Sequence, residues 1–273
     1  MPTFFHVLIT LFNVRYSLKS DLHGLEKWTE ERIPLFEKYC LPSLQAQTNQ
    51  QFAWLIVLDP STTKKQRKQL QEFQLKQPNI FFLDYPDWDT VEQPINEWIQ
   101  SIGIDADYLI TSRVDNDDIL HEDFIATVQS ECKRNPGEYL LNFMNGYNMR
   151  IKKKKNLLFN YQSHTNPFMS LVEENNPKLN TIRRFNHNDW PQKFTRVNVT
   201  TPEPLWLQLV HGKNLLNTVL GKPELAPTTL EQFQLNSEQS SHRNAWRHYW
   251  EKILVFYSKP FKRLDETINP EPY

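Results

Sequence analysis

Short apolar runs alternate with amphipathic segments along the first half of the chain. Four short apolar runs have the length and composition of buried strands, and each is followed by a segment whose apolar residues recur about one helical turn apart. The predicted strands are residues 6–12, 52–58, 80–85 and 108–112. The predicted helices are residues 28–47, 64–76, 91–102 and 121–134. Strand alternating with helix four times predicts an α/β fold with a mostly parallel central sheet flanked by helices.

Proline, hydroxyl and apolar residues set the expected boundaries and buried faces of these helices. Pro34 and Pro42 interrupt the first helix, so we expect it to form in pieces. Ser61 or Thr62 is placed to cap the second helix. The apolar residues expected to face the core are Leu70, Phe73 and Leu75 of the second helix, Ile95, Trp98, Ile99 and Ile102 of the third, and Phe124, Ile125, Val128 and Cys132 of the fourth.

The second half of the chain has a weaker pattern. The expected elements are a strand at 139–149, an exposed turn at 150–156, its return strand at 157–161, a strand at 206–211 and a final helix capped by Ser241. The sequence contains no internal repeat and no domain linker. We therefore expect one domain over residues 1–273, with residues 221–273 as a helical C-terminal extension.

Polar residues follow three of the four predicted strands at the points where the strands end. Asn13 and Arg15 follow the first strand, Asp59 follows the second, and the tetrapeptide Asp-Asn-Asp-Asp at 115–118 follows the fourth. In parallel sheets, ligands bind beyond the carboxyl ends of the strands. We therefore expect these side chains to converge at one edge of the sheet, although they lie far apart in sequence.

The balance of charge narrows the classes of ligand. The 31 basic and 32 acidic residues give a formal net charge of -1, which excludes the basic field of a nucleic-acid-binding protein. The sequence has 6 glycines and contains neither GxGxxG nor GxxxxGK[ST], so a phosphorylated ligand has to be bound by a metal or by basic side chains. The basic segment 150–155 is expected to be a solvated hairpin tip, and its alternative role is peripheral contact with anionic lipid or a polyanionic glycan.

Cysteine content and hydropathy favour a cytoplasmic protein. Cys40 and Cys132 are the only cysteines, too few for a disulfide scaffold or a zinc site. The apolar start FFHVLITLF has no basic segment before it and no small-residue cleavage site after it, unlike a signal peptide. No apolar run approaches the ~18 residues of a membrane span. We therefore expect no transmembrane segment.

The acidic tetrapeptide raises the question of metal binding. An EF-hand loop that starts at Asp115 needs glycine at its sixth position, where the chain has Leu120. A solvated turn that leads into the next helix is the simpler alternative. An Asp-x-Asp at the end of a buried strand, in contrast, supplies oxygen ligands to Mg2+ or Mn2+ and leaves coordination sites open for phosphate oxygens.

The segment VDNDDILHEDF, preceded by LITSR, resembles the metal-binding segment of GT-A glycosyltransferases, and in particular the bacterial rhamnosyltransferase family. Separated blocks in order carry this resemblance and together cover most of residues 5–220. The blocks are FNVR at 12–15, YCLPSLQAQT at 39–48, FAWLIVLDP at 52–60, TSRVDNDDILHEDF at 111–124, PFMSLVE at 167–173 and WLQLVHGKN at 206–214. The resemblance implies the Rossmann-like fold of nucleotide-diphospho-sugar transferases.

The resemblance also implies roles for the residues that end the strands. Asp115, Asp117 and Asp118 would face the metal and the donor diphosphate. Contacts with the nucleotide sugar are implied for Asn13, Arg15, Asp59, Arg113 and Asp115. Arg113 would otherwise neutralise the aspartates, and Asp59 would otherwise cap a helix.

Residues late in the chain complete the implied site. His211 matches the histidine that many GT-A enzymes add to the metal shell, and neutral imidazole is a good ligand for Mn2+; a core histidine is the alternative. Glu173 is the first candidate for the base that deprotonates the acceptor hydroxyl, because a partly apolar pocket can raise the pKa of a carboxylate toward the working pH. Asp189 and Glu174 compete with Glu173 for this role, and a plain surface glutamate is its alternative.

The implied function is a metal-dependent glycosyltransferase that uses Mn2+ or Mg2+. It would move a sugar, expected to be rhamnose, from a nucleotide-diphosphate donor to a hydroxyl of a glycan, lipid-linked or other acceptor. Two other interpretations use the same residues. One is a metal-dependent nucleotidyltransferase or phosphohydrolase. The other is a non-catalytic sugar- or nucleotide-binding module, in which the aromatic residues, 13% of the chain, stack on the ligand.

Overall fold

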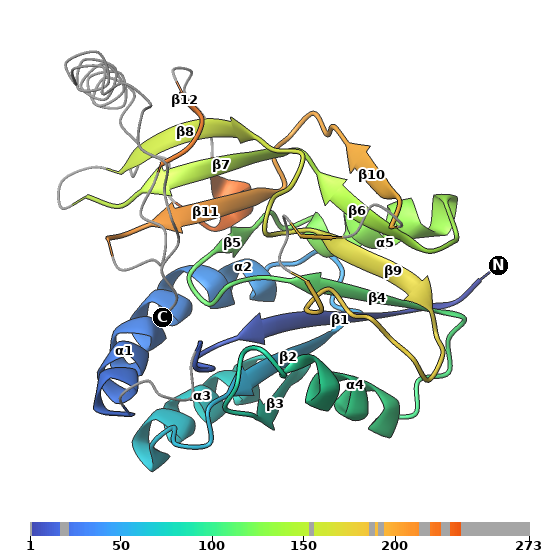
Figure 1. The fold of residues 1–273 in the computed structure, drawn as a ribbon. Helices are drawn as coiled ribbons and strands as arrows, with labels where there is room; N and C mark the ends of the chain where they lie inside the picture. The colour runs from blue at the N-terminus through green and yellow to red at the C-terminus, as the bar shows by residue number, and fades with distance from the viewer. Residues whose placement is uncertain are drawn as a thin grey trace, which may run out of the picture.

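The four strands predicted from the first half of the sequence form one parallel array. The computed structural model describes residues 2–16, 22–152, 156–185, 189–190, 194–212, 219–224 and 230–235 (Figure 1). The array consists of β1 (Phe4–Leu11), β2 (Ala53–Leu58), β3 (Ile80–Asp84) and β4 (Tyr108–Arg113). β1 lies between β2 and β4, and all three pairings, including β2 with β3, are parallel. The predicted α/β fold with a mainly parallel central sheet is confirmed.

Three later strands extend this sheet beyond β4. They are β6 (Tyr139–Phe143), β9 (Ser170–Glu174) and β10 (Arg196–Val199). Over the described part of the chain the order is β10-β6-β9-β4-β1-β2-β3. β9 is inserted antiparallel between β4 and β6. The carboxyl end of β9 therefore lies at the edge opposite to the carboxyl ends of β1 to β4.

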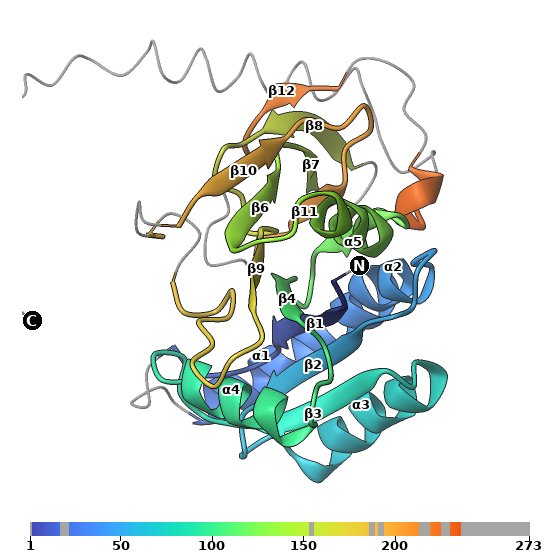
Figure 2. The ribbon, with the colours of Figure 1, turned by 90° about the vertical axis from the view of Figure 1, so that its right-hand side faces the viewer.

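A second, mostly antiparallel sheet lies above the first in Figure 1. It contains β5 (Ile119–Leu120), β7 (Asn145–Arg150), β8 (Leu157–Gln162), β11 (Trp206–Val210) and β12 (Lys222–Pro223) in the order β12-β8-β7-β11-β5. Both views place α3 and β3 at one end of the molecule and β8 and β12 at the other (Figures 1 and 2). Figure 2 shows the same arrangement turned by 90° about the vertical axis.

Alternating residues of the strands face two separate cores. On one face, Leu8 of β1 packs with apolar residues of α1 (Leu22–Leu35), the π-helical turn Phe36–Cys40, α2 (Leu41–Gln45), α3 (Lys64–Lys76) and α5 (Phe124–Arg134). On the other face, Val7 packs with α4 (Glu92–Ser101) and with apolar residues of the segment 179–194. Continuous burial of β1 and β2 on both faces explains why their sequences read as unbroken apolar runs.

The helix boundaries differ in detail from the prediction. The first helix forms in pieces, as predicted, but begins at Leu22. The predicted caps Ser61 and Thr62 are wrong: Thr63 caps α3, because its hydroxyl accepts the Gln66 amide at 3.3 Å while the Gln66 side chain accepts the Thr63 amide at 3.1 Å. Leu75 is 84% exposed and Ile102 is 40% exposed, so neither belongs to the core.

The second half contains more strands than the pattern suggested. The single strand predicted at 139–149 is two strands, which belong to different sheets and meet at Met144. The return strand predicted at 157–161 is confirmed as β8, antiparallel to β7, and the strand predicted at 206–211 is confirmed as β11.

Only part of the predicted helical extension at 221–273 lies within the described residues. Within residues 221–235, the described part forms β12 and the 3-10 turn Glu231–Phe233, whose Phe233 is buried, rather than an α-helix. The predicted helix from Ser241 lies outside the described residues. No helix in the described ranges is long and apolar enough to span a membrane.

Candidate active site at the carboxyl edge of the parallel strands

Arg15 and Asp59 meet at the carboxyl ends of β1 and β2. The Arg15 Nε donates to Asp59 Oδ2 at 2.7 Å, and the carboxylate is 99% shielded from solvent while the Arg15 side chain is 16% exposed. The other oxygen, Oδ1, accepts the backbone amide of Ser61 at 2.8 Å. The predicted convergence of these two residues is therefore observed. The alternative role of Asp59 as the cap of α3 is not observed, because Thr63 occupies the N-cap position.

Asn13 has all of its side chain engaged in the protein interior. Its amide nitrogen donates to the hydroxyls of Thr29 at 3.0 Å and Thr62 at 2.9 Å, and its oxygen accepts the amide of Asp59 at 2.9 Å. Asn13 thus ties together the ends of β1 and β2 and the middle of α1. It supports the edge on which Arg15 lies.

The Asp59 interactions lead to a prediction about stability. We expect Asp59→Ala to lower the free energy of unfolding by about 2–3 kcal/mol, because it removes a buried charged acceptor from the Arg15 guanidinium and the Ser61 amide. Denaturant unfolding provides the measurement. Asp84→Ala is the matched control, because Asp84 pairs with Arg67 at a similar 2.8 Å but is 52% exposed, so its loss should cost less than about 1 kcal/mol. Equal losses for the two variants would contradict this assignment.

The three aspartates of residues 115–118 point to three different partners. Asp115, whose side chain is 45% exposed, lies 3.6 Å from a guanidinium nitrogen of Arg113. Asp117 is buried and binds both the Arg32 guanidinium and His211, whose Nε2 is 2.7 Å from Asp117 Oδ2. Asp118 is buried and accepts the backbone amide of Leu209 at 2.9 Å.

Strand pairing explains why His211 reaches the acidic residues. β11 runs antiparallel to β5, with Leu207 opposite Ile119, so the end of β11 returns alongside residues 115–118. The Trp206 indole anchors this strand, since it packs parallel to the Phe168 ring at 4.9 Å. It also covers Gly146, where a Cβ atom would lie 2.1 Å from the indole. His211 is thus placed by both sheets, and the sequence prediction that it lies near Asp117 is observed.

The aspartates and His211 differ in how well they fit a divalent cation. Asp117 and His211 supply one carboxylate oxygen and one imidazole nitrogen in contact, donor types that suit Mn2+, and the Arg32 guanidinium contacts both of these atoms in this structure. Asp118 does not fit as well: burial, and then the charges of Asp117 and Asp115, raise its pKa well above the usual range, which favours the protonated form. Among the described residues, no group of three or more His, Cys, Asp or Glu side chains is gathered closely enough to hold a metal alone. A cation held by Asp117 and His211, with Asp115 close by in the same turn, would take its other ligands from phosphate oxygens.

Arg32 is a site residue that the sequence interpretation missed. It lies on α1, is 6% exposed, and its guanidinium stacks over the Trp28 ring at 4.6 Å while it binds Asp117 and approaches His211 Nε2 at 3.3 Å. Thr29, Arg32 and Ile33 are the buried residues of α1. Their helical spacing was a usable signal, because it places Arg32 on the buried face of the helix.

Arg183 is a second missed residue, and it lies in a segment without periodicity. Its guanidinium stacks over the Trp88 ring at 4.5 Å. Burial, and then the charge of Arg113, lower the pKa of Arg183 to about 9, with Asp115 opposing the shift, so the guanidinium is still charged at neutral pH. The neighbouring Ile182 amide donates to the Thr111 hydroxyl of β4 at 2.8 Å, so the segment that carries Arg183 lies along the strand that ends in Arg113.

Glu173 lies away from the acidic residues and holds the segment that carries Arg183. In the pairing of β9 with β4 it is opposite Leu109, four residues before the end of β4. Its carboxylate accepts the backbone amides of Asn180 at 2.8 Å and Thr181 at 3.0 Å. Burial raises the pKa of Glu173 above its ordinary value, and these hydrogen bonds offset part of the rise. The structure does not bring Glu173 together with Asp117 and His211.

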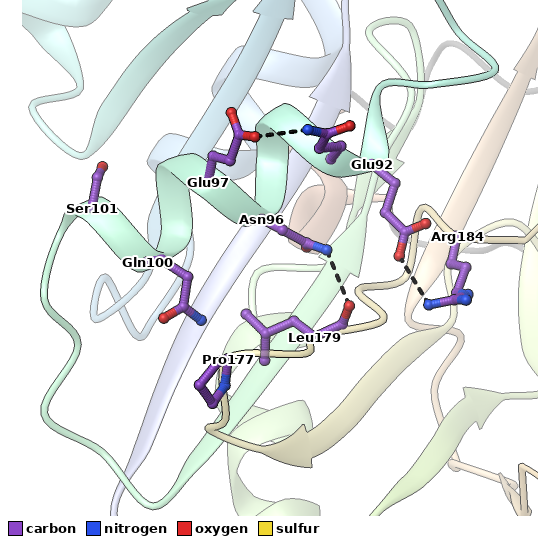
Figure 3. A pocket seen from close by; sticks show the side chains of 9 residues that line it. Glu92, Asn96, Glu97, Gln100, Ser101, Pro177, Leu179 and Arg184 are labelled. Atoms are coloured by element: carbon purple, nitrogen blue, oxygen red, sulfur yellow. Dashed lines mark hydrogen bonds and ion pairs between the residues drawn. The ribbon is translucent and has the colours of Figure 1, made fainter.

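The segment before Arg183 is also anchored to α4, as Figure 3 shows. The Asn96 side chain donates to the Leu179 carbonyl at 3.0 Å, and Arg184 lies 3.7 Å from Glu92. A groove of about 620 Å³ runs between α4 and this segment. Asp189, the other predicted base, follows the same segment and is exposed, next to Trp190, whose ring packs against Phe185 at 5.0 Å.

Comparison with known families gives one match over most of the chain. The sequence model of the family described as "Putative rhamnosyl transferase" matches residues 22–223. No curated protein matches the sequence.

Several solved structures resemble the chain at low identity. TarS of S. aureus has 11% sequence identity and a TM-score of 0.43, and the alignment covers 76% of this chain and 36% of TarS. The mannosyltransferase PcManGT from Pyrobaculum calidifontis, solved in complex with GDP-Man and Mn2+, has 12% identity and a TM-score of 0.34, with 52% of this chain and 35% of that chain covered. The chain thus spans about a third of the length of these two proteins.

Proposed function

The chain belongs to the rhamnosyl transferase family and is a glycosyltransferase, and from this premise we propose that it moves rhamnose from a nucleoside-diphosphate donor to a hydroxyl acceptor with the help of a divalent cation. The acceptor hydroxyl would belong to a glycan or a lipid-linked sugar.

The observation that carries this proposal is the contact between Asp117 and His211. These residues are 94 positions apart in sequence, yet the end of β11 brings the imidazole Nε2 to 2.7 Å from the carboxylate. The contact lies beyond the end of β4, at the sheet edge where parallel α/β folds bind ligands. A site for a cation and a diphosphate at this position supports transfer from a nucleotide sugar.

Each group at the edge has a distinct part in the proposed reaction. A cation held by Asp117 and His211, with Asp115 beside it, would supply Lewis-acid stabilisation of the leaving diphosphate. Arg15 and Asp59, at the ends of the neighbouring strands, would contact the nucleoside. Of the three predicted bases we assign the role to Asp189, because both carboxylate oxygens of Glu173 already accept backbone amides and Glu174 lies opposite Tyr108, at the start of β4.

The proposed chemical step is a direct displacement at the anomeric carbon. The Asp189 carboxylate takes the proton of the acceptor hydroxyl, and the acceptor oxygen forms a bond to the anomeric carbon. The bond from that carbon to the phosphate oxygen breaks, and the nucleoside diphosphate leaves with the electron pair. The anomeric configuration inverts.

Metal-dependent binding of the donor diphosphate tests the proposal. We expect one of dTDP, UDP and GDP to bind at least about tenfold more tightly in Mn2+ than in EDTA. The bound cation would coordinate the phosphate oxygens and offset their negative charge. His211→Ala should lose this difference, as titration calorimetry would measure. His164→Ala is the matched control, since it makes the same substitution at an exposed histidine. A His211→Ala variant that keeps the full Mn2+ effect would show that Asp117 and His211 do not hold the cation.

A further inference from the structure

Two arginines lie together beside the acidic residues with part of their hydrogen-bonding capacity unused. Arg113 is the last residue of β4 and is only 7% exposed, and Arg183 stacks over Trp88 at 4.5 Å. The Nε atoms of both side chains are buried and have no hydrogen-bond partner among the described residues. A buried N–H donor without an acceptor is unfavourable, so each guanidinium presents a donor for which the described chain supplies no acceptor.

The charges at this place are also unbalanced. Arg113 and Arg183 carry the same charge, and the charge of Arg113 lowers the pKa of Arg183. The carboxylate that the structure places beside them is Asp115, which lies 3.6 Å from Arg113 and has a side chain that is 45% exposed. Burying two like charges is costly unless an anion pairs with them. One half-exposed carboxylate at this separation compensates only part of that cost, so a second anion would be bound favourably.

The surrounding structure fixes both guanidinium groups before any ligand binds. Arg113 belongs to a central strand. The segment that carries Arg183 is attached to the sheet where the Ile182 amide donates to the Thr111 hydroxyl at 2.8 Å. Trp88, beneath Arg183, is held by its amide, which donates to the Arg15 carbonyl at 3.0 Å. Preorganised donors lose less conformational freedom on binding than mobile side chains do.

We propose that Arg113 and Arg183 form a phosphate-binding site at the ligand edge, and that it takes a phosphate group of the donor diphosphate. This inference rests on the proposed function for the identity of the ligand. Planar guanidinium groups bind phosphate oxygens through paired N–H donors, which a lysine ammonium cannot reproduce. The position agrees with a diphosphate, because Trp88 contacts both Arg183 and Arg15, the proposed nucleoside contact, while Arg113 lies beside Asp115, which begins the acidic turn.

Binding of inorganic pyrophosphate in EDTA tests this site without a metal. We expect the wild-type protein to bind pyrophosphate, and Arg183→Gln and Arg113→Gln each to weaken its affinity by about 10- to 100-fold, the usual range for losing charged hydrogen bonds. Arg134→Gln is the matched control, because it removes the same charge from a side chain that is 66% exposed on α5. It should bind pyrophosphate as the wild type does.

The outcomes separate this inference from the proposed function. Absence of pyrophosphate binding by the wild type, or unchanged binding by a folded Arg183→Gln or Arg113→Gln variant, would overturn the site. Thermal unfolding identifies which variants are folded, and either folded variant suffices. The Mn2+ effect on nucleotide binding depends on Asp117 and His211, so it can fail while pyrophosphate binding persists, or persist while pyrophosphate binding fails.

Discussion

Replacing Asp189 by asparagine should slow sugar transfer by about 10²–10⁴-fold, the usual contribution of a general base, while the affinity for nucleoside diphosphate stays unchanged. Asparagine keeps the shape of the side chain but cannot accept the proton of the acceptor hydroxyl. Asp189 is exposed and follows the segment that carries Arg183, so it is accessible to an acceptor. Single-turnover transfer and calorimetry on the same preparation would measure the two quantities.

Glu173→Gln is the matched comparison, because it makes the same carboxylate-to-amide change. The Glu173 oxygens accept the amides of Asn180 and Thr181, and a glutamine nitrogen can replace only one of these acceptors. Thr181 has a positive φ of 45°, so the backbone there depends on such support. We expect Glu173→Gln to lower stability and, by displacing Arg183, to weaken diphosphate binding. The opposite result would be transfer at the wild-type rate by Asp189→Asn, together with slow transfer and normal donor affinity in Glu173→Gln. That result would make Glu173 the base and would remove this role from Asp189.

The parallel half of the fold was predictable because its signals are local. The strands β1, β2 and β4 are buried runs, β3 is a short apolar run, and α4 and α5 carry apolar residues at helical spacing, so each element is defined by its own sequence. The rule that ligands bind at the carboxyl ends of parallel strands then placed Arg15 next to Asp59 before any contact was known.

The features that sequence could not predict depend on partners that are distant in the chain. β9 runs antiparallel between β4 and β6, and only this direction places Glu173 opposite Leu109 rather than beside Asp117. The split of residues 139–149 into strands of different sheets at Met144 likewise has no local signal. Arg183 lies in a segment without periodicity, and its stacking on Trp88 arises only from tertiary structure.

Removing Asp117 alone should lower the free energy of unfolding by about 3–5 kcal/mol, because it takes the carboxylate partner from a buried guanidinium. The side chains of Arg32 and Asp117 are only 7% and 6% exposed. The Arg32 guanidinium lies against the Trp28 ring at 4.6 Å, so it cannot reach water without moving α1 or leaving that ring. Denaturant unfolding of Asp117→Ala would measure the loss.

A double-mutant cycle separates loss of the pair from loss of a single side chain. Arg32→Met combined with Asp117→Ala should recover most of the stability, because neither charge remains buried and methionine can still pack against Trp28. Arg134 and Glu131 form the matched control pair, since the Arg134 side chain is 66% exposed, and their coupling should be about 0–1 kcal/mol. If the effects of Arg32→Met and Asp117→Ala simply add, the two residues are not coupled, and Asp117 is held at the ligand edge by other contacts, with His211 the first to test.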